Sequence, residues 1–318
     1  MVDVSILIPT KNGERYIAEV LDQALHRQQT DRSLEAIVLD SGSRDRTREL
    51  AAKAGAIVRE IPPETFNHGL TRNLLAEQAR GNYLVYLTQD ATPANEHWLE
   101  SLLRPLDAEI LLAGVYSAHR PRSDCDPVTS YLIRQVWALA GESFPARTNV
   151  IANWQEYRAN LGSYVYFANT SSAIRRSVWQ ETPFREVSFA EDADWARRVL
   201  EAGYLTRFEP RSVVVHSHTY RIPDLFRRNF EHAQAFQEMF GPTDRRSLAQ
   251  RLAEAIELAV RIGRAGERAE RGQRKLVLRA LAVLFAQELG AWLGAHPNLV
   301  PERLRRRLEL QRSLIRAS

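Results

Sequence analysis

The chain has 318 residues, of which 44% are hydrophobic, so it can bury a sizeable core and corresponds by length to about two domains. Its single cysteine, Cys125, excludes an internal disulfide and a cysteine-rich metal site, and it favours a reducing compartment. The formal net charge of +4 is unevenly distributed, because residues 1–220 carry −4 and residues 221–318 carry +8.

Four short apolar runs in the first 93 residues each lead into a polar cluster. Helical periodicity separates them, so the order β-α-β-α predicts an early parallel sheet. The first run begins after Asp3 and stops at Pro9, which is too short for the apolar core of an export signal. Ligands of open α/β sheets bind beyond the carboxyl ends of strands, so the polar clusters predict a binding site. The four runs are residues 4–8, 36–39, 56–58 and 83–87.

The middle of the chain alternates between regular and loose patterns. Asn95 is placed to cap a helix. Prolines interrupt residues 117–160 on both sides of a helix-like stretch at 128–139. We interpret the whole segment 117–160 as a mobile flap over a bound acceptor molecule. A regular apolar pattern returns at 164–168. We then expect a helix at about 192–202 and a last strand at 213–216.

The chain after Tyr220 reads as helices only. The stretch 276–293 is the most apolar, but charged and polar residues interrupt the roughly 20 apolar residues that a bilayer span needs, so we predict a core or interfacial helix. The basic tail fits an anionic membrane face, at about 1 kcal/mol per basic residue near the surface. The sequence has no zinc ligands, basic–aromatic ribbon or recognisable RNA module, so we expect no nucleic-acid partner. Helix breaks are predicted at Pro223, Gly241-Pro242, Gly272 and Pro297 to Pro301.

The order of the motifs resembles the inverting family 2 glycosyltransferases of the GT-A fold. Phe66-Asn67-His68-Gly69 and the run from Leu87 to Pro93 are similar to its bacterial rhamnosyltransferase-like branch, and the likeness covers roughly residues 4–220. It implies an α/β fold with a Rossmann-like, mixed and mainly parallel sheet flanked by helices. The expected domains are 1–220, with a nucleotide-binding half (1–93) and an acceptor half (94–220), and a basic helical C-terminal region, 221–318.

The resemblance implies donor-binding residues at the ends of the first two strands. In the family, the aspartate at the position of Asp40 accepts a hydrogen bond from a ring N–H of the nucleobase. Pro9, Thr10 and Asn12 end the neighbouring strand and should line the same pocket. The alternative for Asp40 is a structural one, in which it caps the helix that follows Ser43.

A second donor-binding cluster precedes and enters the first turn of a helix. It contains Asn67, Gly69, Arg72 and Asn73. Free N–H groups and the positive end of a helix favour a phosphate or a polar sugar there, and Arg72 adds a cation. In the alternative, Asn67 caps the helix, Gly69 makes the turn and Arg72 faces water. Arg228, one helix after the last strand, is a further candidate for the diphosphate, although a solvated arginine is the alternative.

Thr88-Gln89-Asp90 lie where the family keeps its Asp-x-Asp motif, which holds a divalent ion against the donor diphosphate. The first acid is replaced by Thr88, so Asp90 carries the metal role alone, and Mg²⁺ or Mn²⁺ should bind weakly without nucleotide. His216 and His218 share one face of an extended chain, and one of them is a candidate metal ligand. In the structural alternative, Asp90 only opens the loop before Pro93. Each histidine would then be a hydrogen-bonded core residue at the end of a strand.

Glu191, Asp192 and Asp194 begin a predicted helix and resemble the family's Glu-Asp motif. There the aspartate takes a proton from the acceptor hydroxyl, which is worth about 10²–10⁴ in rate. We assign this role to Asp192, with Glu191 orienting an acceptor hydroxyl or a neighbouring side chain and Asp194 as the alternative base. Acids that complement the helix dipole are the alternative.

The sequence thus predicts a metal-dependent inverting glycosyltransferase. The donor would be a nucleoside-diphosphate sugar, with dTDP-rhamnose suggested by the branch and UDP- or GDP-sugars open, and the acceptor a hydroxyl of a cell-surface glycan or its lipid carrier. We expect a cytoplasmic protein at the inner face of the plasma membrane, with self-association left open. Two other functions remain as alternatives: a catalytically silent membrane-associated scaffold, and a sugar-phosphate nucleotidyltransferase, which would need a Gly-rich, Arg-containing loop that residues 8–13 lack.

Overall fold

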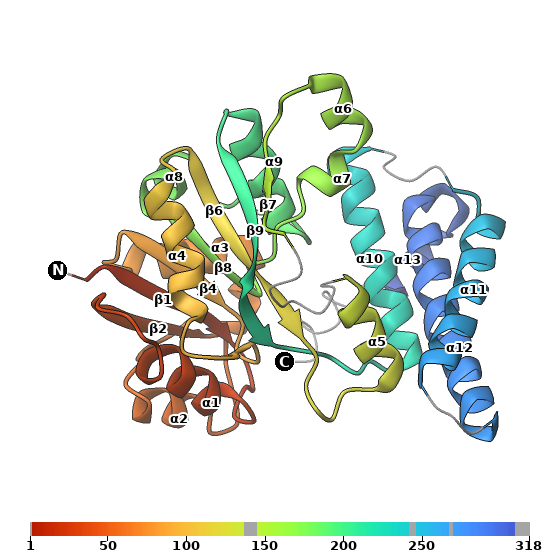
Figure 1. Ribbon diagram of the computed structural model, residues 1–318, viewed down its shortest axis with the longest axis horizontal. Coiled ribbons are helices and arrows are strands. Elements are labelled where there is room, and N and C mark those ends of the chain that lie inside the picture. Colours follow the sequence, from red (N-terminus) through yellow and green to blue (C-terminus); the bar gives the residue numbers. More distant parts are fainter. Residues whose placement is uncertain (1, 137–144, 242–245, 267–269, 309–318) are drawn as a thin grey trace. The chain divides into compact units, whose positions relative to one another are not determined.

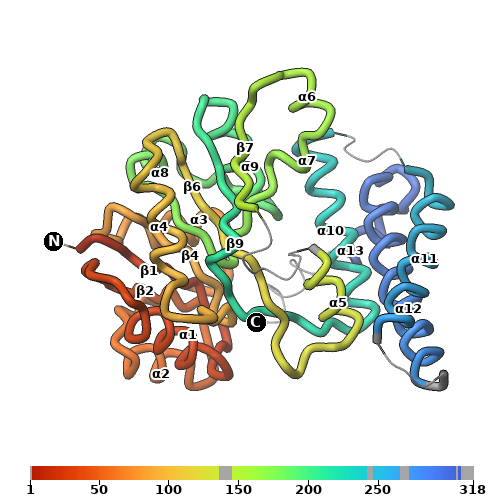
Figure 2. The backbone as a smooth tube through the Cα atoms, viewed as in Figure 1, coloured from red at the N-terminus to blue at the C-terminus, as the bar shows by residue number. Residues whose placement is uncertain are grey.

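The computed structural model describes residues 2–136, 145–241, 246–266 and 270–308, and the chain divides into two compact units. The first unit consists of Met1–Arg120 and Trp137–His216, and the second of Pro121–Val136 and Ser217–Ser318. The predicted division at 220 lies close to the boundary at 216, but the sequence did not predict that 121–136 would join the C-terminal unit. Figure 2 traces the backbone through both units.

The first unit is built on a nine-stranded mixed sheet with the order β3-β2-β1-β4-β8-β6-β9-β5, and β7 pairs with β9 off this path. Among the described residues, four strand pairings are parallel and four are antiparallel. The strands are β1 (Val4–Thr10), β2 (Leu34–Asp40), β3 (Ile57–Glu60), β4 (Tyr83–Leu87), β5 (Thr92–Pro93), β6 (Leu112–Arg120), β7 (Arg147–Asn149), β8 (Ser171–Arg175) and β9 (Leu205–Val215).

The parallel half of the sheet consists of the four predicted apolar runs, so that prediction is confirmed. Thr10 lies opposite Asp40, and Leu7 lies opposite Tyr86. The carboxyl ends of β1, β2 and β4 therefore meet at one edge. Buried aliphatic residues on both faces of β1 explain why it occupies the interior of the sheet.

Helices of the first unit pack on this sheet and bury its core (Figure 1). Ile17 and Leu21 share a core cluster with Trp98 and Leu102 and with strand residues such as Ile6. The helices are α1 (Ile17–Leu21), a π-helical turn η1 (Asp22–His26), α2 (Thr47–Lys53), the 3₁₀ turn η2 (Pro63–Thr65), α3 (His68–Gln78), α4 (Trp98–Ala108), α6 (Trp154–Ala159), α7 (Leu161–Tyr164), α8 (Arg176–Glu181) and α9 (Glu191–Glu201).

The antiparallel strands bring later parts of the chain to the same edge. β8 lies between β4 and β6 and runs antiparallel to both. β5 pairs with the end of β9, with Thr92 opposite Val215. The loop after β4 therefore reaches the carboxyl end of β9.

The second unit is helical, with α10, α11 and α12 lying side by side (Figure 1). Val128 of α5 joins a core with Ala259, Ile262 and Leu284. Gly290 is needed where α12 crosses α10, because an added Cβ would lie 2.4 Å from the Phe226 carbonyl oxygen. The helices are α5 (Pro127–Val136), α10 (Ile222–Phe240), α11 (Leu248–Gly266), α12 (Glu270–Ala295), the 3₁₀ turn η3 (Pro297–Leu299) and α13 (Glu302–Leu308).

Segment Gly272–Ala295 of α12 is long and apolar enough to cross a membrane by length and composition, with a mean hydropathy of 1.6. Only 28% of the most apolar 18-residue stretch of this segment is buried inside the structure. The core helix of a soluble protein passes the same test, so the segment alone does not establish a span.

Several local predictions need correction. The expected helix break at Gly272 is wrong, because α12 starts at Glu270 and continues through it. Only α7 overlaps the run 164–168, and the nearby strand is β8 at 171–175. The helix predicted at 128–139 is observed as α5, which ends at Val136, and its last residues lie outside the described part of the chain, as does Pro242.

Candidate functional site

The loops that follow β1 and β2 are joined by hydrogen bonds. Asn12 has a left-handed backbone (φ 50°), and its N–H donates to Ser43 Oγ at 2.7 Å. Its side-chain oxygen accepts from the Arg44 N–H at 2.9 Å, and the Gly13 N–H donates to Thr47 Oγ1 at 2.7 Å. These bonds fix the shape of the sheet edge at which Pro9, the penultimate residue of β1, and its neighbours were predicted to bind a donor.

Asp40 is fully buried at the end of β2, and its contacts are those of a turn. Oδ1 accepts from the N–H groups of Gly42 (3.0 Å) and Ser43 (2.8 Å), and Oδ2 accepts from the Ser43 hydroxyl. The helix-capping alternative for Asp40 is wrong, because α2 starts at Thr47 with Arg46 at its N-cap, and Asp40 instead closes the turn at Gly42 and Ser43. A carboxylate has about four acceptor positions, so Oδ2 retains acceptor capacity. Because Asp40 is fully buried, a base N–H would reach it only after a rearrangement, and nucleobase recognition stays a prediction.

Gln89 connects the ends of β4 and β1. Its Oε1 accepts from Thr10 Oγ1 at 2.5 Å and from the Lys11 N–H at 2.9 Å, while its Nε2 donates to the Lys11 carbonyl at 3.1 Å. Thr10 is buried and uses its hydroxyl in this bond. Thr10 and Gln89 therefore share one edge, as expected, but their polar groups mainly bind each other.

Asp90 and His216 approach each other where β5 joins the end of β9. His216 Nε2 lies 3.6 Å from Asp90 Oδ1, and both side chains are about 15% exposed. His119 packs edge-on against His216, with ring centroids 5.4 Å apart. Burial, and then the neighbouring His216, hold the pKa of His119 well below its usual value, so this imidazole is neutral. A carboxylate oxygen and an imidazole nitrogen are a donor pair that fits Mn²⁺ better than the all-oxygen preference of Mg²⁺.

His218 and Arg228 belong to the second unit. His218 is two residues along the chain from His216, which limits the separation of their Cα atoms to about 7 Å. Arg228 lies on α10 with its guanidinium over the Tyr220 ring, 5.4 Å from the centroid. Their metal- and donor-binding roles stay predictions.

The cluster at the start of α3 contacts the segment before α9. Asn67 caps α3 through Oδ1, and its Nδ2 donates to the Val187 carbonyl at 3.0 Å. Asn73 Nδ2 donates to the Phe184 carbonyl at 2.8 Å, and its Oδ1 accepts from the Phe184 N–H at 3.1 Å. The predicted cap is therefore present, and donor binding by this cluster is neither required nor tested by these contacts.

The predicted acids begin α9, as expected, and lie in a buried ionic cluster. Glu191 Oε1 is 2.9 Å from Arg72 Nη1, with only 7% and 6% of these side chains exposed. The alternative in which Arg72 faces water is therefore wrong. Burial works to raise the pKa of Glu191, but Arg72 and then His68 outweigh it, so the pKa lies below its usual value and Glu191 is ionised.

Asp192 is half-buried beside Glu191. Burial first, and then the Glu191 charge, raise its pKa to about 7, with a smaller opposing effect of Arg72. Its Oδ1 accepts from the Ala193 N–H at 2.9 Å, and Oδ2 accepts from the Asn169 N–H at 3.3 Å. A carboxylate that titrates near neutrality is suited to accept a proton. Asp194 differs, because it forms an ion pair with Arg198 at 2.9 Å.

Sequence reasoning missed the turn that connects the two parts of this site. The Thr88 N–H donates to the Thr170 carbonyl at 3.1 Å, and Asn169 reaches both acids, with its Nδ2 3.4 Å from Glu191 Oε1. Tyr166 is also close, since Asp192 contributes to the upward shift of the Tyr166 pKa, after burial and Tyr116. A polar Asn-Thr-Ser-Ser run after aromatic residues was the available signal.

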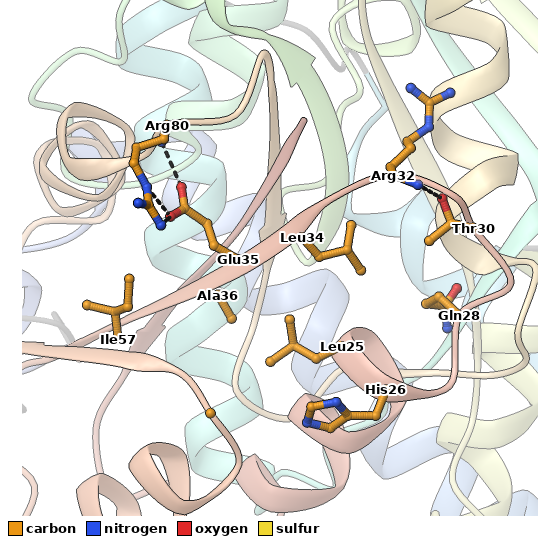
Figure 3. A pocket seen from close by; sticks show the side chains of 11 residues that line it. Leu25, His26, Gln28, Thr30, Arg32, Leu34, Glu35, Ala36, Ile57 and Arg80 are labelled. Atoms are coloured by element: carbon orange, nitrogen blue, oxygen red, sulfur yellow. Dashed lines mark hydrogen bonds and ion pairs between the residues drawn. The ribbon is translucent and has the colours of Figure 1, made fainter. Parts of the chain in front are cut away.

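A cavity of about 550 Å³ opens elsewhere on the first unit. Leu25, Leu34 and Ile57 line it, and the paired Arg80 and Glu35 lie at its side (Figure 3). Leu34 and Ile57 are the first residues of β2 and β3, so this cavity lies at the amino ends of the parallel strands, opposite the predicted site.

Comparison with known proteins agrees with this architecture. The model of "Glycosyl transferase family 2" matches residues 5–180, and that of "Glycosyl transferase family group 2" matches residues 105–292. The chain is 32% identical to the O-antigen chain rhamnosyltransferase RfbN of Salmonella typhimurium over 72% of this chain and 70% of that protein. It is 31% identical to the O-antigen chain rhamnosyltransferase WbaN of Salmonella anatum over 73% and 71%.

Solved structures show the same fold at lower identity. A mannosyltransferase from Pyrobaculum calidifontis in complex with GDP-Man and Mn²⁺ superposes with a TM-score of 0.53 at 20% identity, covering 98% of this chain and 79% of that one. Glucosyl-3-phosphoglycerate synthase from Mycobacterium tuberculosis, in complex with Mn²⁺, UDP and glucosyl-3-phosphoglycerate, gives 0.51 at 20% identity, covering 76% and 81%. The chain is therefore a glycosyltransferase of family 2 with the GT-A fold, in its rhamnosyltransferase-like branch.

Proposed function

We propose that this glycosyltransferase is metal-dependent and inverting, and that it moves a sugar from a nucleoside diphosphate to a hydroxyl of a cell-surface glycan or a lipid-linked acceptor. The likeness to RfbN and WbaN favours dTDP-rhamnose over a UDP- or GDP-sugar. The observation that carries the proposal is a series of three hydrogen bonds between neighbouring segments: Thr10 to Gln89, Thr88 to Thr170, and Asn169 to Asp192. These bonds support a metal-binding loop that lies between the nucleotide pocket and the base.

The donor would lie along the carboxyl ends of β1, β2 and β4. Its base would meet Asp40 and the β1 end formed by Pro9, Thr10 and Asn12. Its diphosphate would lie near residues 88–90. Arg228 is a further proposed donor residue, whereas Asn67, Gly69, Arg72 and Asn73 contact the segment before α9 or Glu191, its first residue, and are left out of the proposed donor set.

The proposed metal ligands are Asp90 and His216. His218, two residues further along the chain, is the proposed third ligand. When bound, Mn²⁺ would neutralise charge on the departing nucleoside diphosphate. The mixed oxygen and nitrogen donors are the reason to expect Mn²⁺ rather than Mg²⁺.

Asp192 would act as the general base. Its carboxylate accepts the proton of the acceptor hydroxyl while that oxygen forms a bond to the anomeric carbon. The bond from this carbon to the diphosphate oxygen breaks on the opposite face, and its electron pair leaves with the nucleoside diphosphate. Burial, and then the charge of ionised Glu191, keep the pKa of Asp192 high enough for proton transfer near neutral pH.

The second unit would bind the cytoplasmic face of an anionic membrane. Leu278, Phe285 and Leu289 are 67%, 36% and 38% exposed and recur at helical spacing on α12, on the side away from core residues such as Leu284. Exposed Arg274 and Lys275 lie one turn before this stripe. Apolar residues with flanking basic charge are the pattern of a helix that lies in a membrane surface.

A membrane test compares L278E/F285E with the control I256E, which alters another exposed apolar residue on α11. Sedimentation with vesicles containing anionic phosphatidylglycerol should fall for the double variant and persist for the control. Unchanged sedimentation with a loss of self-association would make a second copy of the chain the partner of this face.

The donor test is a thermal-shift panel of dTDP, UDP, GDP and CMP with and without Mn²⁺. A ligand at about 100 times its dissociation constant adds about 2.7 kcal/mol to stability, which is a measurable shift. We expect the largest shift with dTDP and Mn²⁺. If no nucleotide shifts the melting temperature, the donor site fails and a silent scaffold becomes the better hypothesis.

The mechanism test compares D192N with D194N. D192N should abolish transfer and leave nucleotide binding intact, whereas D194N, which alters a neighbouring acid on the same helix, should retain transfer. Near-normal turnover of D192N would remove Asp192 as the base.

A further inference from the structure

The start of α3 packs against residues 184–187, in the segment before α9. Asn67 and Asn73 each donate to a carbonyl of this segment, at Val187 and Phe184. Between them, Gly69 faces the same backbone so closely that an added Cβ would lie 2.2 Å from the Arg185 carbonyl oxygen. Asparagine and glycine at these positions therefore suit a contact with residues 184–187.

The same segment ends in a strained residue. Ala190 has a left-handed backbone, with φ 57° and ψ 43°, immediately before Glu191 and Asp192. A non-glycine residue keeps such a conformation only where the surrounding structure holds it. The bonds from α3 hold the preceding residues, so they also set the position from which the acid pair projects.

Arg72 extends this contact to the acids themselves. Its Nη1 lies 2.9 Å from Glu191 Oε1 and also donates to the His68 carbonyl at 3.0 Å. The residue is only 5% exposed, so a donor phosphate could not reach the guanidinium without a rearrangement. Two adjacent buried carboxylates without this cation would repel each other strongly.

The charged groups around Asp192 come from three parts of the first unit. Glu191 is on α9, Arg72 and His68 are on α3, and Tyr166 precedes β8. Arg72 is the cation that opposes the rise of the Asp192 pKa, and burial and Glu191 are the causes of that rise. Removing the Arg72 charge would leave Glu191 and Asp192 to repel, so it should raise the pKa of Asp192 further.

We propose that the Asn67–Asn73 cluster positions the segment that carries the acid pair, and that Arg72 acts on the proposed base Asp192 through Glu191. Arg72 is then a positioning residue that needs no contact with the donor. The proposal rests on the proposed function, because it assumes that Asp192 is the base.

The test measures the pH dependence of kcat between pH 5.5 and 9 for the full chain, together with dTDP binding, in R72Q, R72K and a control, R80Q. Arg80 follows the other end of α3 and likewise pairs with a buried glutamate, Glu35. R72Q should move the acidic side of the kcat profile, the acid limb, to higher pH by about one unit, because the loss of the Arg72 charge leaves Glu191 and Asp192 to repel each other. R72K should lower kcat but keep the pH at which kcat rises near the wild-type value. R80Q should leave this pH unchanged. Binding of dTDP should change less than about twofold in R72Q and R72K.

Other outcomes separate the possibilities. If R72Q weakens dTDP binding tenfold and leaves the limb in place, Arg72 is a donor residue and the inference fails. If D192N retains turnover, the base assignment fails, whatever R72Q does. If R72Q does not fold, N73S decides: a fall in kcat at unchanged donor KM supports the positioning role, and wild-type kcat contradicts it.

Discussion

The charge of Glu191 should set the pH at which the enzyme becomes active. With a pKa of about 7, Asp192 is ionised to about one tenth at pH 6 and to about nine tenths at pH 8. A general base works only in its ionised form, so kcat should rise about tenfold between these values and reach a plateau above pH 8. Glu191 is the second of the two causes that raise this pKa, after burial.

The decisive variant is E191Q, which removes the charge and keeps the shape of the side chain. Because Arg72 then acts on Asp192 without a competing carboxylate, the acid limb should move to lower pH by about one unit or more. Relative to its own plateau, E191Q should therefore be several-fold more active at pH 6 than the wild type. Release of dTDP can be followed by a coupled phosphate assay, with D194N as the control. A limb that stays near pH 7, or moves upward, would refute the electrostatic argument.

Three further results are expected. G69A should lose about 1–3 kcal/mol of stability, seen in urea unfolding, because the new Cβ overlaps the Arg185 carbonyl; unchanged stability would show that the segment can move away. D90A should abolish the Mn²⁺-dependent part of the dTDP thermal shift and retain the metal-independent part, and an intact Mn²⁺ effect would exclude Asp90 as a ligand. Burial opposes the lowered pKa of Glu35, but bonds from Ser5 and Arg80 outweigh it, so its stabilising effect is present above about pH 4.5 and lost as the pH falls through the folded pKa. E35Q should therefore lower the free energy of unfolding at pH 7 by about 1–2 kcal/mol, seen as a lower melting temperature, and reduce the further loss of stability below pH 4.5; equal acid sensitivity in both proteins would contradict this.

The first half of the sheet could be predicted because its strands are apolar and continuous. β8 could not, because it opens with Ser171 and Ser172, which are polar yet fully buried. The Ser171 hydroxyl is satisfied by distant partners: its Oγ accepts from Trp98 Nε1 at 2.9 Å and lies 2.7 Å from Ser117 Oγ. A buried polar residue is stable only with such partners, and local sequence does not show them.

In the candidate site, too, the sequence predicts the location but not the side-chain contacts. That Thr10, Asp40 and Gln89 share one edge follows from the rule that ligands bind at the carboxyl ends of strands. The ion pair between Arg72 and Glu191 joins residues far apart in the chain, and periodicity around Arg72 gives a surface position just as readily. The side-chain assignments therefore needed three-dimensional contacts, while the location of the edge did not.

The insertion of β8 beside β4 has a consequence for how the protein is made. On the ribosome, β4 is complete after residue 87, but its second neighbour is not available until residues 171–175 have been translated. At about 5–20 residues per second, one edge of the nascent sheet stays open for roughly 4–17 seconds. An unpaired apolar strand is prone to join another chain, so we expect truncations that end before residue 171 to aggregate and newly made chains to depend on a chaperone over this interval.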